Sequence, residues 1–296
     1  MYNQIDNLDI VISSHQGKVR DIHDLGDKLL IVTSDRISAF DVVFPDPLPG
    51  KGVILNQIAA HIFKTTSQIV PNHFITDRVE DFPPEFAPYK SWLEGRSMLV
   101  QKLRVIPVEC IVRGYISGSA WSEYQQSRSI GGRPIDEDLR ESQKFAQPLF
   151  TPSTKASSGH DVNISFEQMK QRMDPAIAEF IQAKSLELYH WAHAKLLDKG
   201  IVLADTKFEF GAFGNQIILA DEALTPDSSR FWDLSLYEVG KSPASFDKQI
   251  VRDHLLSSGW NKQPPAPRLP EDIVQKALDK YRQIRDLIIG DDLCQK

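Results

Sequence analysis

The 296-residue sequence has few cysteines, no excess of basic residues and no long apolar run, and each of these absences excludes a class of protein. Cys110 and Cys294 are too few for a disulfide framework, which favours a reducing compartment. The 34 Lys and Arg residues are outnumbered by 40 Asp and Glu residues, and the net charge of −6 argues against binding nucleic acid through a broad basic surface. No apolar stretch approaches the roughly 20 residues of a membrane-spanning helix, and no signal peptide is visible. We therefore expect a cytoplasmic protein without nucleic-acid or membrane partners.

Several motifs that mark common enzyme classes are also missing. The sequence has no G-x-x-x-x-G-K-[ST] and no G-x-G-x-x-G, so it predicts neither a P-loop nor a dinucleotide fingerprint. It has no H-E-x-x-H, no Cys-x-x-Cys and no G-x-S-x-G, which argues against the usual zinc sites and the hydrolase nucleophile elbow. His190 and His193 lack a third ligand nearby, and we interpret them as surface and packing residues.

The first third of the chain is rich in β-prone segments. Gly26-Asp27 separates segments 18–25 and 28–34, which predicts a hairpin with a two-residue turn. Segments 98–104 and 108–113 are further expected strands, and a lobe boundary is placed close to the first of them.

The sequence predicts helices mainly in the middle and at the end of the chain. Ser165 followed by Gln168 is a capping-box signature. Asp174-Pro175 is typical of the N-cap and first turn of a long helix that ends before Gly200. A helix over 55–63, a last helix over 271–289 and a mobile polar loop over 151–165 that orders over substrates are also expected.

The segment 201–222 predicts a β-hairpin with one charged face. Because side chains alternate along a strand, Asp205, Lys207 and Glu209 point the same way, and an apolar face is left to pack on the preceding helix. If Phe210 pairs with Gln216, then Asp205 lies opposite Asp221, and a slip of one residue replaces Asp221 with Glu222. Two carboxylates beside a lysine are either a site for Mg²⁺ and phosphate or a solvated face with cross-strand ion pairs.

Three other polar segments are candidates for binding an anion. Residues 112–119 (VRGYISGS) combine an arginine, glycines and serine hydroxyls, and residues 224–232 (LTPDSSRFW) combine a Pro-Asp-Ser-Ser turn with Arg230. Lys18 and Arg20 lie on one face of an expected strand, where they either cover phosphate oxygens or protect a sheet edge. Each segment has a bland alternative as a turn, a cap or a charged edge.

Taken together, these segments resemble the phosphoribosylaminoimidazole-succinocarboxamide synthase (SAICAR synthetase) family. The resemblance rests on segments that follow one another through most of the chain: GKVRDI at 17–22, SDRISAFD at 34–41, VIPVECIVRGYISGS at 105–119, FTPSTKASSGHDVNIS at 150–165, ADTKFEFG at 204–211 and LADEALTPDSSRFW at 219–232. His23 departs from the tyrosine that is more common after the first of these motifs.

The resemblance implies an α+β fold with an antiparallel β-rich N-terminal lobe over a larger mixed α/β lobe and ATP in the interlobe cleft. We expect the lobes to span 1–101 and 102–296, the second with a C-terminal helical extension. The implied enzyme is an ATP- and Mg²⁺-dependent ligase of purine biosynthesis. It joins L-aspartate to the carboxylate of carboxyaminoimidazole ribotide (CAIR), through an acyl phosphate, and no protein partner is implied.

The resemblance also implies roles for individual residues. Lys207 lies beside the carboxylate being activated and Asp205 orients it, while Glu209 and Asp221 hold the metal. Nucleotide-binding positions are Lys18, Arg20, Gln101, Leu103 and Glu109, and substrate-binding positions are Ser38, Arg113, Ser119, Asp227 and Arg230.

Two alternatives remain beside the synthetase. A small-molecule kinase of the inositol-phosphate type also uses an Asp-x-Lys pattern in its metal-binding segment, although the Glu-Phe-Gly and Pro-Asp-Ser-Ser-Arg segments favour the synthetase. A non-catalytic nucleotide-binding module would require some of these charged residues to be missing, and all of the matched ones are present.

Overall fold

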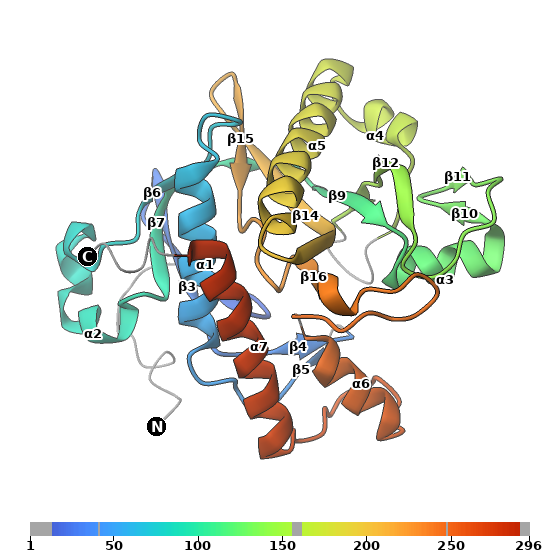
Figure 1. Cartoon of the computed structure of the whole chain (residues 1–296). Helices are drawn as coiled ribbons and strands as arrows, with labels where there is room; N and C mark the ends of the chain where they lie inside the picture. Colours follow the sequence, from blue (N-terminus) through green and yellow to red (C-terminus); the bar gives the residue numbers. More distant parts are fainter. Residues whose placement is uncertain (1–13, 41, 156–161, 247, 291–296) are drawn as a thin grey trace.

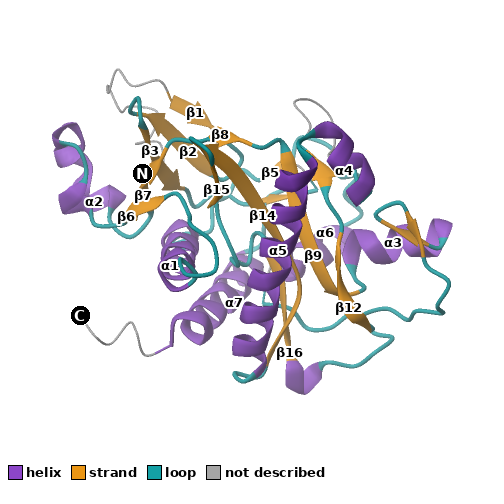
Figure 2. Ribbon diagram, turned by 90° about the horizontal axis from the view of Figure 1, so that it is seen from above, coloured by secondary structure: helices purple, strands orange, loops and turns teal. Residues whose placement is uncertain are grey.

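The computed structural model describes residues 14–40, 42–155, 162–246 and 248–290. Two antiparallel sheets lie side by side in the molecule, with helices packed around them (Figure 1). Figure 2 shows that helix α5 (Pro175–Leu197) crosses the larger sheet, while α1 (Lys51–Thr65) and α7 (Glu271–Ile289) lie next to each other beside the smaller one.

The N-terminal sheet has five strands in the order β1-β2-β3-β7-β6. Its strands are β1 (Ser14–Gln16), β2 (Arg20–Asp24), β3 (Lys28–Thr33), β6 (Phe74–Thr76) and β7 (Ser97–Gln101). The predicted hairpin is confirmed between β2 and β3, where Gly26 has a φ of 92° in the turn. A glycine fits there because other residues rarely adopt a positive φ.

Alternation along the N-terminal strands buries both faces of this sheet. Ile31 and Val100 point towards α1, where they join a large apolar core. Leu30 and Leu99 point the opposite way and pack with Phe86. That second layer consists of two 3₁₀ turns and a short helix, Val79–Asp81, Pro84–Tyr89 and α2 (Lys90–Leu93).

The larger sheet is built around its longest strand, β14 (Ile201–Phe213). The order β12-β9-β14-β15 forms its main path, and β8, β13 and β16 pair at its margins. These strands are β8 (Arg104–Val105), β9 (Val108–Tyr115), β12 (Lys144–Phe150), β13 (Ser153–Thr154), β15 (Gln216–Ala220) and β16 (Ser229–Asp233).

Helix α5 covers the apolar face of the larger sheet. Phe208 and Phe210 are fully buried and share one core with Leu188 and Ala192 of this helix, as the charged-hairpin pattern predicted. Asp174 caps the helix through the Ala176 N–H. Because this layer occupies one side of β14, the charged side chains of the strand face the other side.

The remaining elements surround the two sheets. They are β4 (Ser38–Ala39), β5 (Val42–Val43), α3 (Gly118–Ser127), β10 (Ser129–Ile130), β11 (Arg133–Pro134), α4 (Phe166–Arg172), a 3₁₀ turn (Leu234–Leu236) and α6 (Gln249–Ser257). A second core joins Ile37 and Leu48 to Val251 of α6 and Leu278 of α7, so the C-terminal helices pack on the N-terminal half.

Most predicted helix ends are confirmed. The Ser165–Gln168 capping box is present in both directions, and α7 spans the predicted residues 271–289. The helix expected over 55–63 is longer and begins at Lys51. The central part of the loop expected over 151–165, residues 156–161, lies outside the described residues.

The predicted register of the charged hairpin is wrong. Phe213, not Phe210, pairs with Gln216, so Glu209 lies opposite Ala220. The strand continues three residues further because its Gly211 pairs with β8. The turn is then only two residues, with Gly214 at a φ of 58°.

The fold is α+β, as predicted. One apolar core contains residues of both sheets, such as Val100 and Phe208. The division into lobes 1–101 and 102–296 stays a prediction. Within the described ranges, no helix combines the length and the apolar character needed to span a membrane.

Candidate active site

Strands β9 and β14 place the predicted site residues on a common face. Asp205 pairs directly with Arg113, and Lys207 pairs with Ile111. Glu109 and Glu209 lie two residues further along each strand, on the same face. The predicted position of Asp205 opposite Asp221 is therefore wrong, because two arginine-bearing strands flank Asp205 instead.

One end of this face is a buried cluster around Asp205. Its carboxylate accepts a hydrogen bond from Arg113 Nη1 at 3.4 Å and a shorter one from Arg230 Nη1, and Ser117 Oγ lies 3.4 Å away. Arg113 also donates to Ser119 Oγ at 3.4 Å. Burial lowers the pKa of Arg113, and Asp205 opposes that shift. Asp205 thus fixes two guanidinium groups, and its predicted catalytic role stays a prediction.

An open pocket lies over this face, with about 500 Å³ of empty space, part of which is open to solvent. Its lining comes from β9, the start of α3, β14, the turn before β16, β16 itself and α6. The predicted site residues that line it are Arg113, Ser119, Asp205, Lys207, Asp227 and Arg230. The lining, among the residues that the structure describes, does not include Ser38, which was also predicted to bind substrate. Ser38 lies on the short strand β4.

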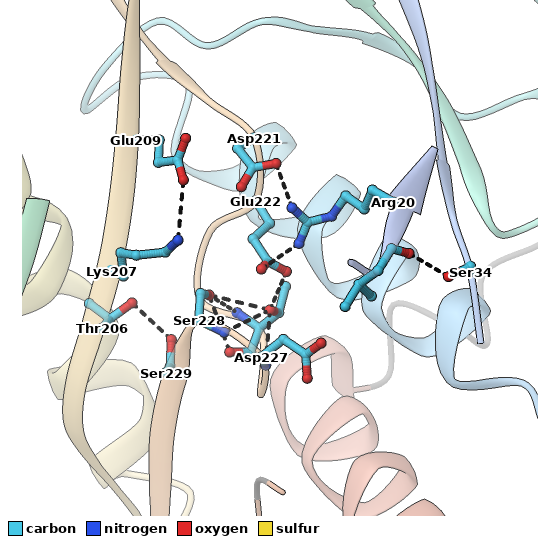
Figure 3. A network of polar contacts seen from close by, with 12 residues as sticks. Arg20, Ser34, Thr206, Lys207, Glu209, Asp221, Glu222, Asp227, Ser228 and Ser229 are labelled. Carbon is cyan, nitrogen blue, oxygen red and sulfur yellow. Dashed lines mark hydrogen bonds and ion pairs between the residues drawn. The ribbon is translucent and has the colours of Figure 1, made fainter. Parts of the chain in front are cut away.

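Lys207 lies between the pocket and a group of carboxylates. Its Nζ donates to Glu109 Oε1 at 2.7 Å and to Glu209 Oε1 at 3.1 Å, and Figure 3 shows the second of these bonds. Burial alone would lower the pKa of Lys207, but Glu209 and Glu109 outweigh it and raise the pKa. The ammonium is therefore charged at neutral pH. Lys155, to which the sequence analysis assigned no role, donates to Glu209 Oε2 at 2.5 Å.

Asp221 reaches the same region from the end of β15. It follows Ala220, the partner of Glu209, and has a φ of 61°. Arg20 Nη1 donates to Asp221 Oδ1 at 2.5 Å, and Arg20 Nη2 forms an ion pair with Glu222 (Figure 3). Burial would raise the pKa of Asp221, but Arg20 and Lys207 hold it below its ordinary value.

Asp227 has a different environment from the other carboxylates. Lys51 Nζ lies 2.7 Å from Asp227 Oδ2, Tyr281 Oη donates to Oδ1 at 2.7 Å, and Lys248 Nζ lies 3.8 Å from Oδ1. Burial would raise the pKa of Asp227, but Lys248 and Lys51 lower it well below its ordinary range. Although Asp227 lines the pocket, its carboxylate joins α1 to α7.

Two of the predicted nucleotide-binding residues, Gln101 and Leu103, lie where the N-terminal sheet meets the larger one. Gln101 ends β7 and donates from its side chain to the Asp27 carbonyl at 2.6 Å. Leu103 packs against Gly211 of β14, where a Cβ would lie 2.7 Å from the Leu103 Cβ. Lys18 is exposed in the turn before β2, so it is not on the same strand as Arg20 as predicted. The turn forms because the Gly17 N–H bonds to the Arg20 carbonyl.

The donor set formed by Glu209 of β14 and Asp221, which follows β15, suits a magnesium ion only together with other oxygen ligands. Glu209 and Asp221 supply hard carboxylate oxygens, which Mg²⁺ prefers. Among the described residues, no group of three or more His, Cys, Asp or Glu side chains is arranged to hold a metal. Two carboxylates with nearby cations for phosphates fit an ion that takes its other ligands from a nucleotide and water.

Comparisons with known proteins give the family of this chain. A family model described as SAICAR synthetase matches residues 13–267. The chain belongs to the SAICAR synthetase family. Phosphoribosylaminoimidazole-succinocarboxamide synthase of Thermodesulfovibrio yellowstonii is 52% identical over 278 residues, which cover 94% of this chain and 95% of that protein.

Solved structures of SAICAR synthetases have the same fold. A structure described as SAICAR-synthase from Saccharomyces cerevisiae complexed with SAICAR is 40% identical, with a TM-score of 0.88 over 96% of this chain and 97% of that one. A SAICAR synthetase (Type-2) in complex with ADP is 24% identical, with a TM-score of 0.70 over 94% of this chain and 98% of that one, and shows the fold alone.

Membership in the SAICAR synthetase family makes this chain an ATP-dependent ligase of purine biosynthesis, as the sequence predicted. The structure adds two residues that sequence reasoning missed, Lys51 and Lys155, and it pairs Arg20 with Glu222, which the sequence analysis named only as the alternative to Asp221. Lys155 and Glu222 lie inside the matched motifs at 150–165 and 219–232, and this position was the sequence signal that could have identified them. Lys51 lies in no matched motif.

Proposed function

We infer that this chain joins the amino group of L-aspartate to the carboxylate of CAIR while ATP is split to ADP and phosphate. Family membership supports this reaction, and the yeast relative was solved with the product SAICAR. The single observation that carries the residue roles is the shared face of β9 and β14. It presents guanidinium groups at one end and carboxylates at the other, with Lys207 between them.

The arginine end of the pocket is the site for the ribotide. Arg113 and Arg230 converge from different strands on Asp205, and guanidinium groups suit the oxygens of an anionic substrate. Ser119 lies in the first turn of helix α3 and lines the same pocket. Asp205 positions the arginines, and neutralises part of their charge before the substrate binds.

The carboxylate end is the site for the nucleotide phosphates and the metal. Glu209 and Asp221 would hold Mg²⁺, which supplies charge stabilisation on the phosphate oxygens when bound. Arg20, with Lys18 close to it in sequence, covers the phosphates, and the hinge at 101–103 contacts the adenine. Glu109, which is predicted to bind the nucleotide, accepts a hydrogen bond from Lys207.

Lys207 lies where the two ends meet, so it is the residue beside the carboxylate being activated. Its raised pKa keeps it cationic, and a cation there offsets the charge of a carboxylate approaching a phosphate. Catalysis then depends on positioning and electrostatic stabilisation.

The reaction proceeds through an acyl phosphate. A carboxylate oxygen of CAIR attacks the γ-phosphorus of ATP, which forms the acyl phosphate and releases ADP. The aspartate amine then attacks the acyl carbon, loses a proton, and the C–O bond to the phosphate breaks. The phosphate that leaves therefore retains one oxygen of the original carboxylate.

Oxygen labelling tests this sequence. CAIR labelled with ¹⁸O in its carboxylate is incubated with MgATP and L-aspartate, and phosphate and product are analysed by mass spectrometry. We expect one ¹⁸O in the phosphate and the other in the amide of SAICAR. Unlabelled phosphate formed together with SAICAR would contradict the acyl phosphate, and no SAICAR at all would contradict the ligase assignment.

A further inference from the structure

Glu209 is held by two lysines, one on each carboxylate oxygen. Lys207 Nζ donates to Oε1 at 3.1 Å and Lys155 Nζ donates to Oε2 at 2.5 Å. The carboxylate is almost fully buried, with 6% of its side chain exposed. A proposed metal ligand therefore has a cation on both of its oxygens.

The two lysines differ in how firmly they are held. Lys207 lies within β14 and is also bonded to Glu109 at 2.7 Å. Lys155 follows the short strand β13, and 45% of its side chain is exposed. An exposed ion pair adds little stability, and a long lysine side chain can move its ammonium into solvent at small cost. Lys155 is therefore the lysine that can leave Glu209.

The second proposed metal ligand has a similar arrangement. Asp221 is bonded to Arg20 at 2.5 Å, and the same guanidinium also pairs with Glu222. Both carboxylates that would hold the metal are thus neutralised by cations that lie at the phosphate end of the site. These counter-cations are in place to become phosphate ligands.

We propose that Lys155 is an exchangeable counter-cation, which occupies Glu209 in the free enzyme and transfers to the nucleotide phosphates when metal and nucleotide bind together. The proposal rests on the proposed function, because it takes Glu209 as a metal ligand. A divalent cation beside Glu209 repels the Lys155 ammonium, whereas a phosphate offers that ammonium a new partner. Lys155 therefore couples the two binding events, and the coupling is reciprocal.

The test measures binding by the nucleotide-free protein, without CAIR or L-aspartate. Calorimetry gives the Kd of Mn²⁺ alone, of ADP alone, and of ADP at saturating Mn²⁺. In the wild type we expect weak binding of Mn²⁺ alone and a clear decrease in the Kd of ADP when Mn²⁺ is present. The ratio of the two ADP constants is the coupling.

Lys155→Met removes the counter-cation. We expect Mn²⁺ alone to bind about fivefold more tightly and the coupling with ADP to fall about tenfold. Lys155→Arg keeps the charge and should keep most of the coupling. Lys64→Met is the matched control, because Lys64 pairs with Asp77 at 2.9 Å and is 52% exposed, on helix α1. This control should leave both quantities unchanged.

Two results would overturn the role of Lys155. One is a Lys155→Met variant that binds Mn²⁺ and couples it to ADP as the wild type does. The other is a wild type in which Mn²⁺ and ADP bind independently. Either result in a chain that still produces SAICAR contradicts only the counter-cation. A chain that couples Mn²⁺ to ADP but makes no SAICAR contradicts the proposed function instead.

Discussion

Asp221 and Asp227 are six residues apart and were both predicted as site residues, yet their surroundings differ. Asp227 faces the ammonium of Lys51, which is completely buried in the first turn of α1. Asp221 faces Arg20, and 27% of the Asp221 side chain is exposed. Both carboxylates have a lowered pKa, so the pKa shift alone does not distinguish them.

A structural carboxylate differs from a ligand-binding one in where its partner cation lies, in the core or at the open end of the site. The Lys51 ammonium cannot leave Asp227 without placing a charge in the core, where an unpaired ion is very costly. Arg20 can exchange Asp221 for a phosphate because it lies at the open end of the site. We therefore expect Asp227 to contribute mainly to stability and Asp221 mainly to turnover.

The largest effect is expected from Asp221→Asn. The loss of one metal-binding carboxylate should reduce kcat at least about 1,000-fold, whereas the free energy of unfolding should change by less than about 1 kcal/mol. Steady-state kinetics over a range of Mg²⁺ concentrations and urea unfolding measure the two quantities. Near-normal kcat at saturating Mg²⁺ would remove the metal assignment.

Lys51→Met should have the opposite profile. It leaves Asp227 buried without its nearest cation and should lower the free energy of unfolding by about 3 kcal/mol, as measured in urea. Lys64→Met serves as the control here too and should cost less than about 0.5 kcal/mol, since its ion pair is exposed. Equal costs for the two variants would show that burial of the Lys51 pair does not matter.

Arg230→Ala should weaken binding of CAIR about 30-fold and leave ATP binding nearly unchanged, because Arg230 lies at the arginine end of the pocket. Gly118→Ala perturbs the same arginine without removing it, because a Cβ at position 118 would collide with the Arg230 guanidinium. Its effect on CAIR binding should therefore be smaller. Gly214→Ala adds similar backbone strain, at a φ of 58°, with open space around it. Calorimetry with both ligands should rank Arg230→Ala above Gly118→Ala, and Gly214→Ala should match the wild type. Equal losses of CAIR and ATP affinity would contradict the role of Arg230.

The smallest expected effect is the pH dependence of the stability difference between the wild type and Lys51→Met. In the wild type, cations keep the pKa of Asp227 low, so its contribution to stability is complete above its unfolded pKa of about 4 and declines only at lower pH. In Lys51→Met the nearer cation is lost while Lys248 remains beside Asp227, so the pKa of Asp227 rises from its wild-type value and its protonation offsets part of the loss as the pH falls. The stability gap between wild type and variant should narrow by about 1 kcal/mol between pH 5 and pH 3, measured by urea unfolding. A gap that widens towards pH 3 would contradict the assignment of the Lys51 pair.

Local signals predicted local structure well. The capping box at Ser165 and the limits of the last helix follow from interactions between residues close in sequence, and both are confirmed. The register of the charged hairpin depends on β8, which pairs with Gly211 from about a hundred residues away. The pattern of the hairpin alone contains no information about that strand, and so the predicted turn was too long.

The sequence predicted which residue types form the site better than it predicted how they are arranged. Alternation along β14 correctly placed Asp205, Lys207 and Glu209 on one face. Their partners come from other strands and helices, so the sequence did not reveal that Asp205 is held by arginines. Lys51 lies outside the matched motifs, and a single lysine at the start of a helix gives no sign in the sequence that it is buried.

The most direct test of the account is ADP release with MgATP, measured with CAIR and L-aspartate supplied singly and together, and with the product identified by mass. The account predicts ADP only when both are present, together with an equal amount of SAICAR. ADP released with neither substrate, or only with a polyol acceptor, would contradict the ligase assignment.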